Sequence, residues 1–126
     1  MIKVKRWSLK LVEDCQFALV SAGSNFSKKY SPQIAEMGCI VIDNSSAWRM
    51  SPQIPLIVPE VNGHLLKNFK QGIIANPNCA AIQLVLPLGA ILKKLPIEQV
   101  IVSTYQSASG KGQTGIETLK QESHHY

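Results

Sequence analysis

The chain has 126 residues, of which 45% are hydrophobic and 17% charged, and this balance is typical of one globular domain. Its longest apolar run, residues 80–92, is interrupted by Gln83, Pro87 and Gly89, so the sequence predicts no membrane span. The net charge of +5 comes from lysines spread along the chain, without the interleaved aromatic residues of a nucleic-acid platform. We therefore expect no nucleic-acid or membrane partner, and the charge suits an anionic small molecule.

The three cysteines, Cys15, Cys39 and Cys79, are odd in number and lack the close spacing of metal ligands. The sequence therefore predicts no metal site and a reduced compartment. The basic first ten residues are not followed by the apolar core of a signal peptide, so we expect a cytoplasmic protein.

Short apolar runs alternate with helical segments along most of the chain. In chain order, the pattern predicts a strand over residues 17–21, a helix over 26–37, strands over 39–43 and 56–58, a helix over 62–69, a strand over 72–75, a helix over 79–95, a strand over 99–105 and a helix over 112–122. Apolar strands separated by helices are typical of an α/β fold with a mostly parallel sheet.

Small polar residues follow four of the predicted strands. These runs are Ser21-Ala22-Gly23, Asp43-Asn44-Ser45-Ser46, Asn76-Pro77-Asn78-Cys79 and Gln106-Ser107-Ala108-Ser109-Gly110. Because ligands of parallel α/β sheets bind at the carboxyl ends of the strands, we expect the functional site there.

Cys79 follows a predicted strand and begins a predicted helix. At such a position, the helix dipole and the free backbone N–H groups favour the thiolate and hold an oxyanion, which suits a nucleophile that attacks a carbonyl. The alternative is a small buried hydrophobic residue, and that is the interpretation we favour for Cys15 and Cys39.

Two other features suit an anion. Arg49 follows the strand over 39–43, where a guanidinium could bind phosphate or carboxylate, although it could also be a surface arginine. Residues 110–115 match G-x-G-x-x-G, but too many residues separate them from the preceding strand for a tight first phosphate loop. We expect a ligand-facing loop there, with an ordinary turn as the alternative. The histidines, His64, His124 and His125, are interpreted as surface residues.

Five ordered segments carry a family resemblance. They are Ser21-Ala22-Gly23, Val41-Ile42-Asp43-Asn44-Ser45-Ser46-Ala47-Trp48-Arg49, Val58-Pro59-Glu60-Val61-Asn62, Gly72-Ile73-Ile74-Ala75-Asn76-Pro77-Asn78-Cys79 and Ser103-Thr104-Tyr105-Gln106-Ser107-Ala108-Ser109-Gly110. Over residues 17–119 the chain resembles the aspartate-semialdehyde dehydrogenase family.

The resemblance implies an incomplete Rossmann-like parallel sheet with flanking helices that leads into the start of a catalytic and dimerisation domain. Residues 1–76 would end the NADP-binding domain and residues 77–126 would begin the catalytic domain. The implied reaction is the NADPH-dependent reductive dephosphorylation of L-4-aspartyl phosphate to L-aspartate 4-semialdehyde. It serves the biosynthesis of lysine (through diaminopimelate), methionine, threonine and isoleucine. The complete enzyme is expected to be a homodimer.

The resemblance also implies residue roles. Cys79 would be the thioester-forming nucleophile, Gln106 would orient the substrate, and Arg49 and Asn78 would bind the phosphate. The residues that would contact NADP are Ser21, Ala22, Gly23, Ser109 and Gly110.

The chain departs from the family at both ends. No Gly-rich phosphate loop precedes residue 17, and no histidine here matches the family's catalytic histidine. We therefore expect the middle third of a subunit that is inactive by itself. Two alternatives remain: N-acetyl-γ-glutamyl-phosphate reductase, which shares the fold and chemistry, and a non-catalytic truncated or paralogous fragment with a structural or interaction role.

Overall fold

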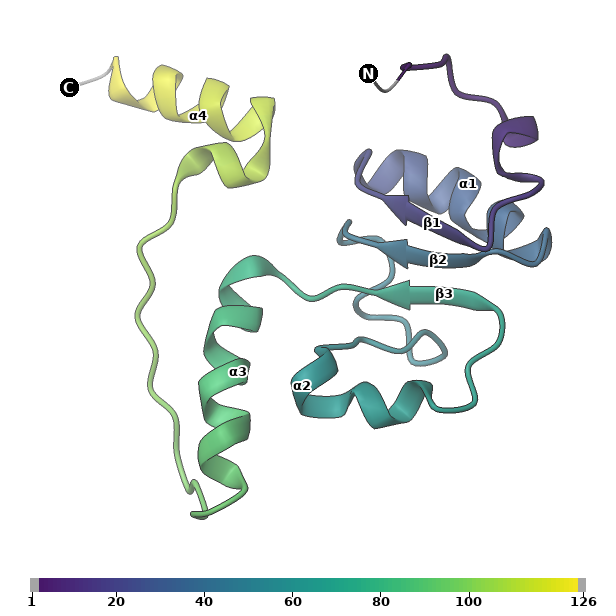
Figure 1. Ribbon diagram of the computed structural model, residues 1–126. Helices are drawn as coiled ribbons and strands as arrows, with labels where there is room; N and C mark the ends of the chain where they lie inside the picture. The colour runs from purple at the N-terminus through teal and green to yellow at the C-terminus, as the bar shows by residue number, and fades with distance from the viewer. Residues whose placement is uncertain (1–2, 125–126) are drawn as a thin grey trace. The chain divides into compact units, whose positions relative to one another are not determined.

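The structure of the chain, a computed structural model, describes residues 3–124. It consists of two compact units, Met1–Pro96 and Ile97–Tyr126. The first unit contains a sheet with its helices, and the second contains an extended segment and a helix (Figure 1). The boundary predicted between residues 76 and 77 separates functional domains of the family, whereas these two units are defined by their packing. That boundary therefore stays a prediction.

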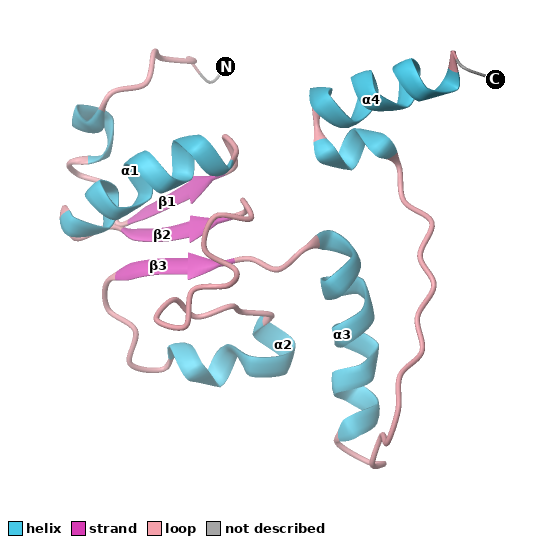
Figure 2. Cartoon of the chain, turned by 180° about the vertical axis from the view of Figure 1, so that it is seen from behind, coloured by secondary structure: helices cyan, strands magenta, loops and turns pink. Residues whose placement is uncertain are grey.

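A three-stranded parallel sheet organises the first unit (Figure 2). Its strands are β1 (Phe17–Val20), β2 (Ile40–Asp43) and β3 (Gly72–Ala75), in the order β1-β2-β3. Val20 is aligned with Asp43, and Asp43 with Ala75, so all three strands end at the same edge. The predicted α/β fold with a parallel sheet and flanking helices is confirmed.

Helix α1 (Ser24–Glu36) covers one face of the sheet and forms the core with it. Ile34 and Val41 are almost fully buried, at 1% and 0% exposure. The next residue of β2, Ile42, points to the opposite face and is 36% exposed, as the alternation of a strand requires. The helix ends before Gly38, whose φ of +89° continues the chain in a conformation that other residues rarely adopt. The helix predicted over 26–37 is therefore confirmed.

The amino-terminal segment packs against α1 and the core. A 3-10 helix over Leu9–Val12 precedes β1. The Trp7 ring contacts Phe26 and Tyr30 in edge-to-face geometry, with centroids 5.0 and 5.5 Å away. These contacts fix the approach of the chain to β1.

The strand predicted over 56–58 is wrong. Only Leu56 forms an isolated parallel bridge, to Ala75, beside hydrogen bonds of the Ala75 backbone with Pro55 and Ile57. Pro55 and Pro59 lack the N–H groups that a longer ladder needs. The helix expected over 62–69 is also shifted, because α2 spans Pro59–Asn62 and a 3-10 helix spans Gly63–Leu66.

Helix α3 (Cys79–Leu92) follows β3 and runs beside α2. An added Cβ at Gly89 would lie 3.0 Å from Val61 Cγ2, so the absent side chain permits the close approach of the two helices. The helix is apolar along much of its length, and Leu86, Ile91 and Leu92 are exposed in this chain.

In the second unit, the strand predicted over 99–105 is wrong. Residues 97–107 are extended, but no described residue pairs with them, and a strand requires a hydrogen-bonded neighbour. A 3-10 helix over Ala108–Lys111 and helix α4 (Gln113–Ser123) follow, which confirms the last predicted helix. Gly115 allows these two helices to touch, because an added Cβ would lie 2.4 Å from the Ala108 carbonyl oxygen.

Candidate active site

Polar side chains from the three strand ends form a chain of hydrogen bonds along the carboxyl edge of the sheet. Asn76 Nδ2, after β3, donates to Asn44 Oδ1 at 2.7 Å. Asn44 Nδ2, after β2, donates to Ser21 Oγ, after β1, at 3.4 Å. These side chains are connected because parallel strands in register end side by side. Sequence reasoning placed the site at this edge but gave Asn44 and Asn76 no role of their own.

Cys79 occupies the first position of α3 and is exposed. Asn78 caps this helix, since its side-chain oxygen accepts the Ala80 backbone N–H at 3.0 Å. The predicted strand–turn–helix setting of the cysteine is therefore present, and the first turn of α3 also has backbone N–H groups without a partner in the helix. Such a position suits a nucleophile, because these groups can bind an oxyanion.

Arg49 is half-buried and joins the ends of β2 and β3. Its Nε donates to the Asn76 carbonyl oxygen at 2.9 Å, and its Nη2 donates to the Asn44 carbonyl oxygen at 3.1 Å. The arginine therefore contacts the backbone of the segment that leads to Cys79. These bonds use only part of the N–H donors of a guanidinium, so donors remain for an anion.

Asp43, the last residue of β2, carries a fully buried carboxylate that sequence reasoning did not single out. Its Oδ1 accepts the Ser45 backbone N–H at 2.8 Å. Its Oδ2 accepts the hydroxyl of Ser31 at 3.0 Å and also that of Ser27. Ser27 in turn accepts the indole N–H of Trp48 at 2.7 Å. The two serines lie one turn apart on α1, so their hydroxyls share one face of the helix, but no local sequence pattern connects them with Asp43 or Trp48.

The surroundings of two buried groups shift their pKa values in opposite directions. Burial alone would raise the pKa of the Asp43 carboxyl, but hydrogen bonds from Ser27, Ser45 and Ser31 outweigh it, so the pKa lies below its ordinary value. Burial raises the pKa of the Cys39 thiol, and the nearby Cys15 raises it further. Cys39 is therefore an inert thiol of the core, as its sequence context predicted, whereas the same interpretation is wrong for Cys15, which is exposed.

The residues predicted to contact the cofactor, Ser21, Ala22 and Gly23, form the exposed turn between β1 and α1. No atom lies within 4 Å of a Cβ added at Gly23, so the space beside this turn is open. The amino terminus of the 13-residue helix α1 points its free N–H groups to the same edge. A short exposed turn, open space and a helix amino terminus suit contact with an anionic ligand.

Gln106, Ser109 and Gly110 lie in the second unit. Gln106 is exposed in the extended segment, and its Nε2 donates to Thr104 Oγ1 at 3.0 Å. Ser109 and Gly110 belong to the 3-10 helix before α4, where the Ser109 and Ser107 hydroxyls are 2.7 Å apart. The glycine pattern at 110–115 therefore follows an extended segment without strand pairing, unlike a first phosphate loop.

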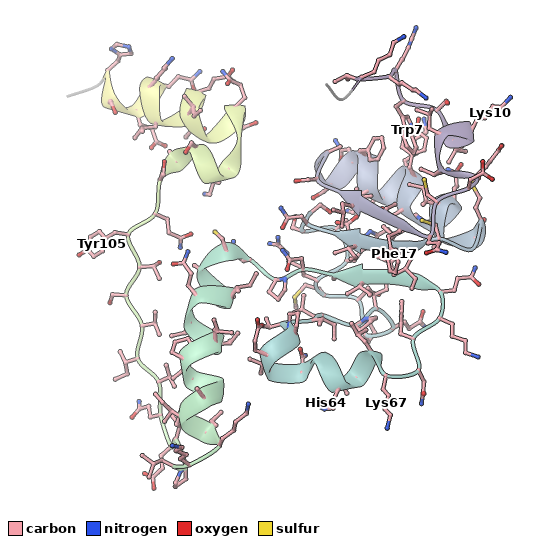
Figure 3. All side chains as sticks on the ribbon, viewed as in Figure 1. Trp7, Lys10, Phe17, His64, Lys67 and Tyr105 are labelled. Carbon is pink, nitrogen blue, oxygen red and sulfur yellow. The ribbon has the colours of Figure 1, made fainter. Side chains whose placement is uncertain are left out.

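His64 is exposed on the 3-10 helix after α2, where Figure 3 shows it beside Lys67, and His124 is exposed at the end of α4. His125 lies outside the described residues. Within residues 3–124, no three His, Cys, Asp or Glu side chains are grouped as metal ligands. The helices described there are all too short or too polar to cross a membrane.

The parallel strands, their common carboxyl edge and the flanking helices place the chain among α/β proteins with a Rossmann-like sheet. Residues 1–69 match the family model described as semialdehyde dehydrogenase, NAD binding domain. An aspartate-semialdehyde dehydrogenase of Aquifex aeolicus is 56% identical over 106 residues, which are 83% of this chain and 31% of that protein. One of Prochlorococcus marinus is 48% identical over 118 residues, 94% of this chain and 34% of that protein.

A solved structure agrees with these relatives. The crystal structure of aspartate-semialdehyde dehydrogenase II of Vibrio cholerae, complexed with ASA, matches with a TM-score of 0.76 and 44% identity. The match covers 87% of this chain and 33% of that one. The chain belongs to the aspartate-semialdehyde dehydrogenase family and spans about a third of the length of the curated relatives that it matches.

Proposed function

We propose that this chain contributes the nucleophile, the phosphate-binding arginine and part of the cofactor site to an NADP-dependent aspartate-semialdehyde dehydrogenase. The observation that carries the proposal is the exposed Cys79 at the capped amino terminus of α3, after a strand end to which Arg49 is bonded. The names of the relatives, at up to 56% identity, support the substrate.

Cys79 would act by covalent catalysis. Its thiolate attacks the carbonyl carbon of L-4-aspartyl phosphate, the C–S bond forms, and the C–O bond to phosphate breaks, so a thioester and free phosphate result. Backbone N–H groups of the first turn of α3 would hold the oxyanion between these events.

Arg49 and Asn78 would lie on the phosphate side of this reaction. The arginine has N–H donors beyond those bonded to Asn76 and Asn44, and a guanidinium forms paired hydrogen bonds with phosphate. Asn78 directly precedes the nucleophile, where its side chain caps α3. An arginine fixed on two backbone carbonyls is already ordered, which lowers the entropic cost of binding the anion.

Ser21, Ala22 and Gly23, at the end of β1, would contact the cofactor in the complete enzyme, and the family resemblance gives the same role to Ser109 and Gly110. The description of the matching family model supports a nicotinamide dinucleotide, and NADP follows from the family resemblance. The chemistry that a bound NADPH supplies is the hydride that reduces the Cys79 thioester to the aldehyde and frees the thiolate. Gln106 would orient the substrate.

The remaining features of the proposal concern the complete enzyme. It would work as a homodimer in the biosynthesis of lysine, methionine, threonine and isoleucine, with a domain boundary between residues 76 and 77. The histidines in the described part of the chain are exposed, and we assign the acid–base role to neither.

Acyl transfer to the chain itself tests the proposal. We expect acetyl phosphate, used as a simple acyl phosphate, to acetylate Cys79 several-fold faster than Cys15, which is also exposed and serves as the internal reference. Peptide mass spectrometry would locate the hydroxylamine-sensitive thioester, and Cys79→Ser would abolish it. Cys15→Ser should leave the Cys79 rate unchanged. Equal labelling of the two thiols would contradict the proposed nucleophile.

A further inference from the structure

The loop that carries Arg49, residues 44–49, is attached to the core through the carboxylate of Asp43. Ser45 donates its backbone N–H to Asp43, and its own hydroxyl accepts the Ala47 backbone N–H at 3.1 Å. Trp48 donates its indole N–H to Ser27, which donates to the same carboxylate. The 44–49 loop is therefore attached at its start and again directly before Arg49.

Arg49 extends this network to the neighbouring strand. Its guanidinium donates to the Asn76 carbonyl oxygen, and the Asn76 backbone N–H donates to the Asp43 carbonyl oxygen at 2.8 Å. The arginine thus lies across the point where the chain leaves β3 and turns toward Cys79. A displacement of the 44–49 loop would break the bond between Arg49 and this turn.

We propose that Asp43 is a positioning residue, whose buried carboxylate holds the 44–49 loop so that Arg49 stays bonded to the backbone of the segment that carries Cys79. The consequence for catalysis rests on the proposed function, because Arg49 is there the phosphate ligand. The placement of the arginine itself does not depend on that function.

The ionised carboxylate matches the hydrogen-bond donors around it. A backbone N–H and two hydroxyl groups converge on its two oxygens. An ionised carboxylate accepts all of these bonds, whereas a protonated carboxyl or an amide carries a donor of its own, so a serine hydroxyl would have to turn and accept the bond that it now donates. The loss of one partner would leave buried polar groups unsatisfied, which the fold avoids by moving the loop.

The hydrogen bonding of Arg49 can be measured directly, because Arg6 and Arg49 are the only arginines of the sequence. An NMR spectrum of the 15N-labelled chain therefore contains two arginine Nε–H signals, and Arg49→Lys assigns them. Arg6 is exposed and serves as the reference. We expect the Arg49 Nε–H to exchange with water roughly fivefold or more slowly than that of Arg6, since a net hydrogen bond contributes about that factor.

Two variants test the role of the carboxylate. Asp43→Asn replaces an acceptor with a donor, and Trp48→Phe removes the indole N–H but keeps an aromatic ring packed against the core. Both variants should bring the exchange rate of the Arg49 Nε–H close to that of the Arg6 Nε–H, so that the ratio of the two rates approaches one. Ser24→Ala is the matched control, because it removes an exposed bond of 2.9 Å from Ser46 on the same loop without touching the buried network. It should leave the ratio unchanged.

The methyl signals of Ile34 and Val41 report whether the core stays folded. The proposal would be overturned if the Arg49 Nε–H of the unaltered chain exchanged as fast as that of Arg6. It would also be overturned if the slow exchange of this group persisted in Trp48→Phe. If the Asp43→Asn variant loses the methyl signals of the core, the proposal is tested by the exchange rates of Trp48→Phe alone. Loss of these signals in both variants would also overturn it, because the network would then hold the core rather than the arginine. A protected Arg49 with an unreactive Cys79 would refute the proposed function and leave the positioning role intact.

Discussion

Cys39 and Cys79 illustrate how surroundings decide the role of a residue. Cys39 lies fully buried before β2, where burial raises the pKa of its thiol and keeps it from reacting. Cys79 is exposed at the amino terminus of α3, beside backbone N–H groups that have no partner within the helix. Only the second thiol can meet an electrophile, so residue type alone does not identify the nucleophile.

Asp43 gives the chain a predictable response to acid. Its pKa is lower in the folded chain than the ordinary value of 3.8, because hydrogen bonds to the carboxylate outweigh its burial. A depressed pKa means that the stabilisation is fully present above the ordinary value and is lost as the pH falls through the folded-state value. Protonation would also require the hydroxyl of Ser27 or Ser31 to turn and accept a bond that it now donates.

Ser31→Ala should move this acid response to higher pH. The variant removes one donor to the carboxylate, so the pKa of Asp43 rises toward 3.8 and the loss of stability begins earlier during acidification. Urea unfolding midpoints, measured from neutral pH to below that value, would show the shift. Asp14→Asn, which removes an exposed carboxylate, should not move it. An unchanged pH dependence in Ser31→Ala would contradict the assignment of the acid response to Asp43.

At the scale of secondary structure, Gly115 sets two physical effects against each other. Alanine is favoured over glycine within a helix by about 1 kcal/mol. A Cβ at this position, however, would lie 2.4 Å from the Ala108 carbonyl oxygen and 2.7 Å from Lys111 Cβ. Backbone at that distance cannot yield as a flexible side chain would, so the steric cost should exceed the gain in helix propensity.

We therefore expect Gly115→Ala to separate the 3-10 helix over Ala108–Lys111 from α4. Backbone amide NMR signals of residues 108–111 should shift, with faster hydrogen exchange of the Gly112 N–H that is bonded to the Ser109 carbonyl oxygen. Thr114→Ala, at the adjacent exposed position, is the control and should preserve these signals. If the Gly112 N–H exchanges more slowly in Gly115→Ala than in Thr114→Ala, the gain in helix propensity outweighs the steric cost of the close contact.

The sequence predicted the elements whose pattern is local. The strands near residues 17, 40 and 72 were found because each is a short apolar run between turn residues, and α1 and α4 because helical content and glycines delimit them. The runs at 56–58 and 99–105 have the same composition but form no strand, because pairing depends on a neighbour that a local pattern does not contain.

The same limit applies to the site. The positions of Cys79 and Arg49 at strand ends were predictable, since carboxyl ends of parallel strands share one edge. The buried cluster around Asp43 was not, because its serines come from α1 and its tryptophan from the 44–49 loop. Only the packing of α1 on β2 brings these side chains together.

At the scale of the whole molecule, the division into Met1–Pro96 and Ile97–Tyr126 predicts where the folded chain is open to proteases. Residues 97–107 are extended and exposed, without strand pairing among the described residues. Tyr105, which projects from this segment in Figure 3, is fully exposed. Proteases cut such unprotected segments before they cut helices and strands, since cleavage requires an extended backbone that is free to enter the protease.

Brief chymotrypsin treatment should therefore cleave first after Tyr105, while the aromatic residues of the packed cluster, Trp7, Phe26 and Tyr30, stay protected. Mass spectrometry of the early products would identify the bond. Tyr105→Ser should remove this product and slow the loss of intact chain, whereas Tyr30→Phe keeps a cleavable residue within the cluster and should leave the early pattern unchanged. First cleavage beside Phe26 or Tyr30 would mean that the core of the first unit opens more easily than the segment joining the two units.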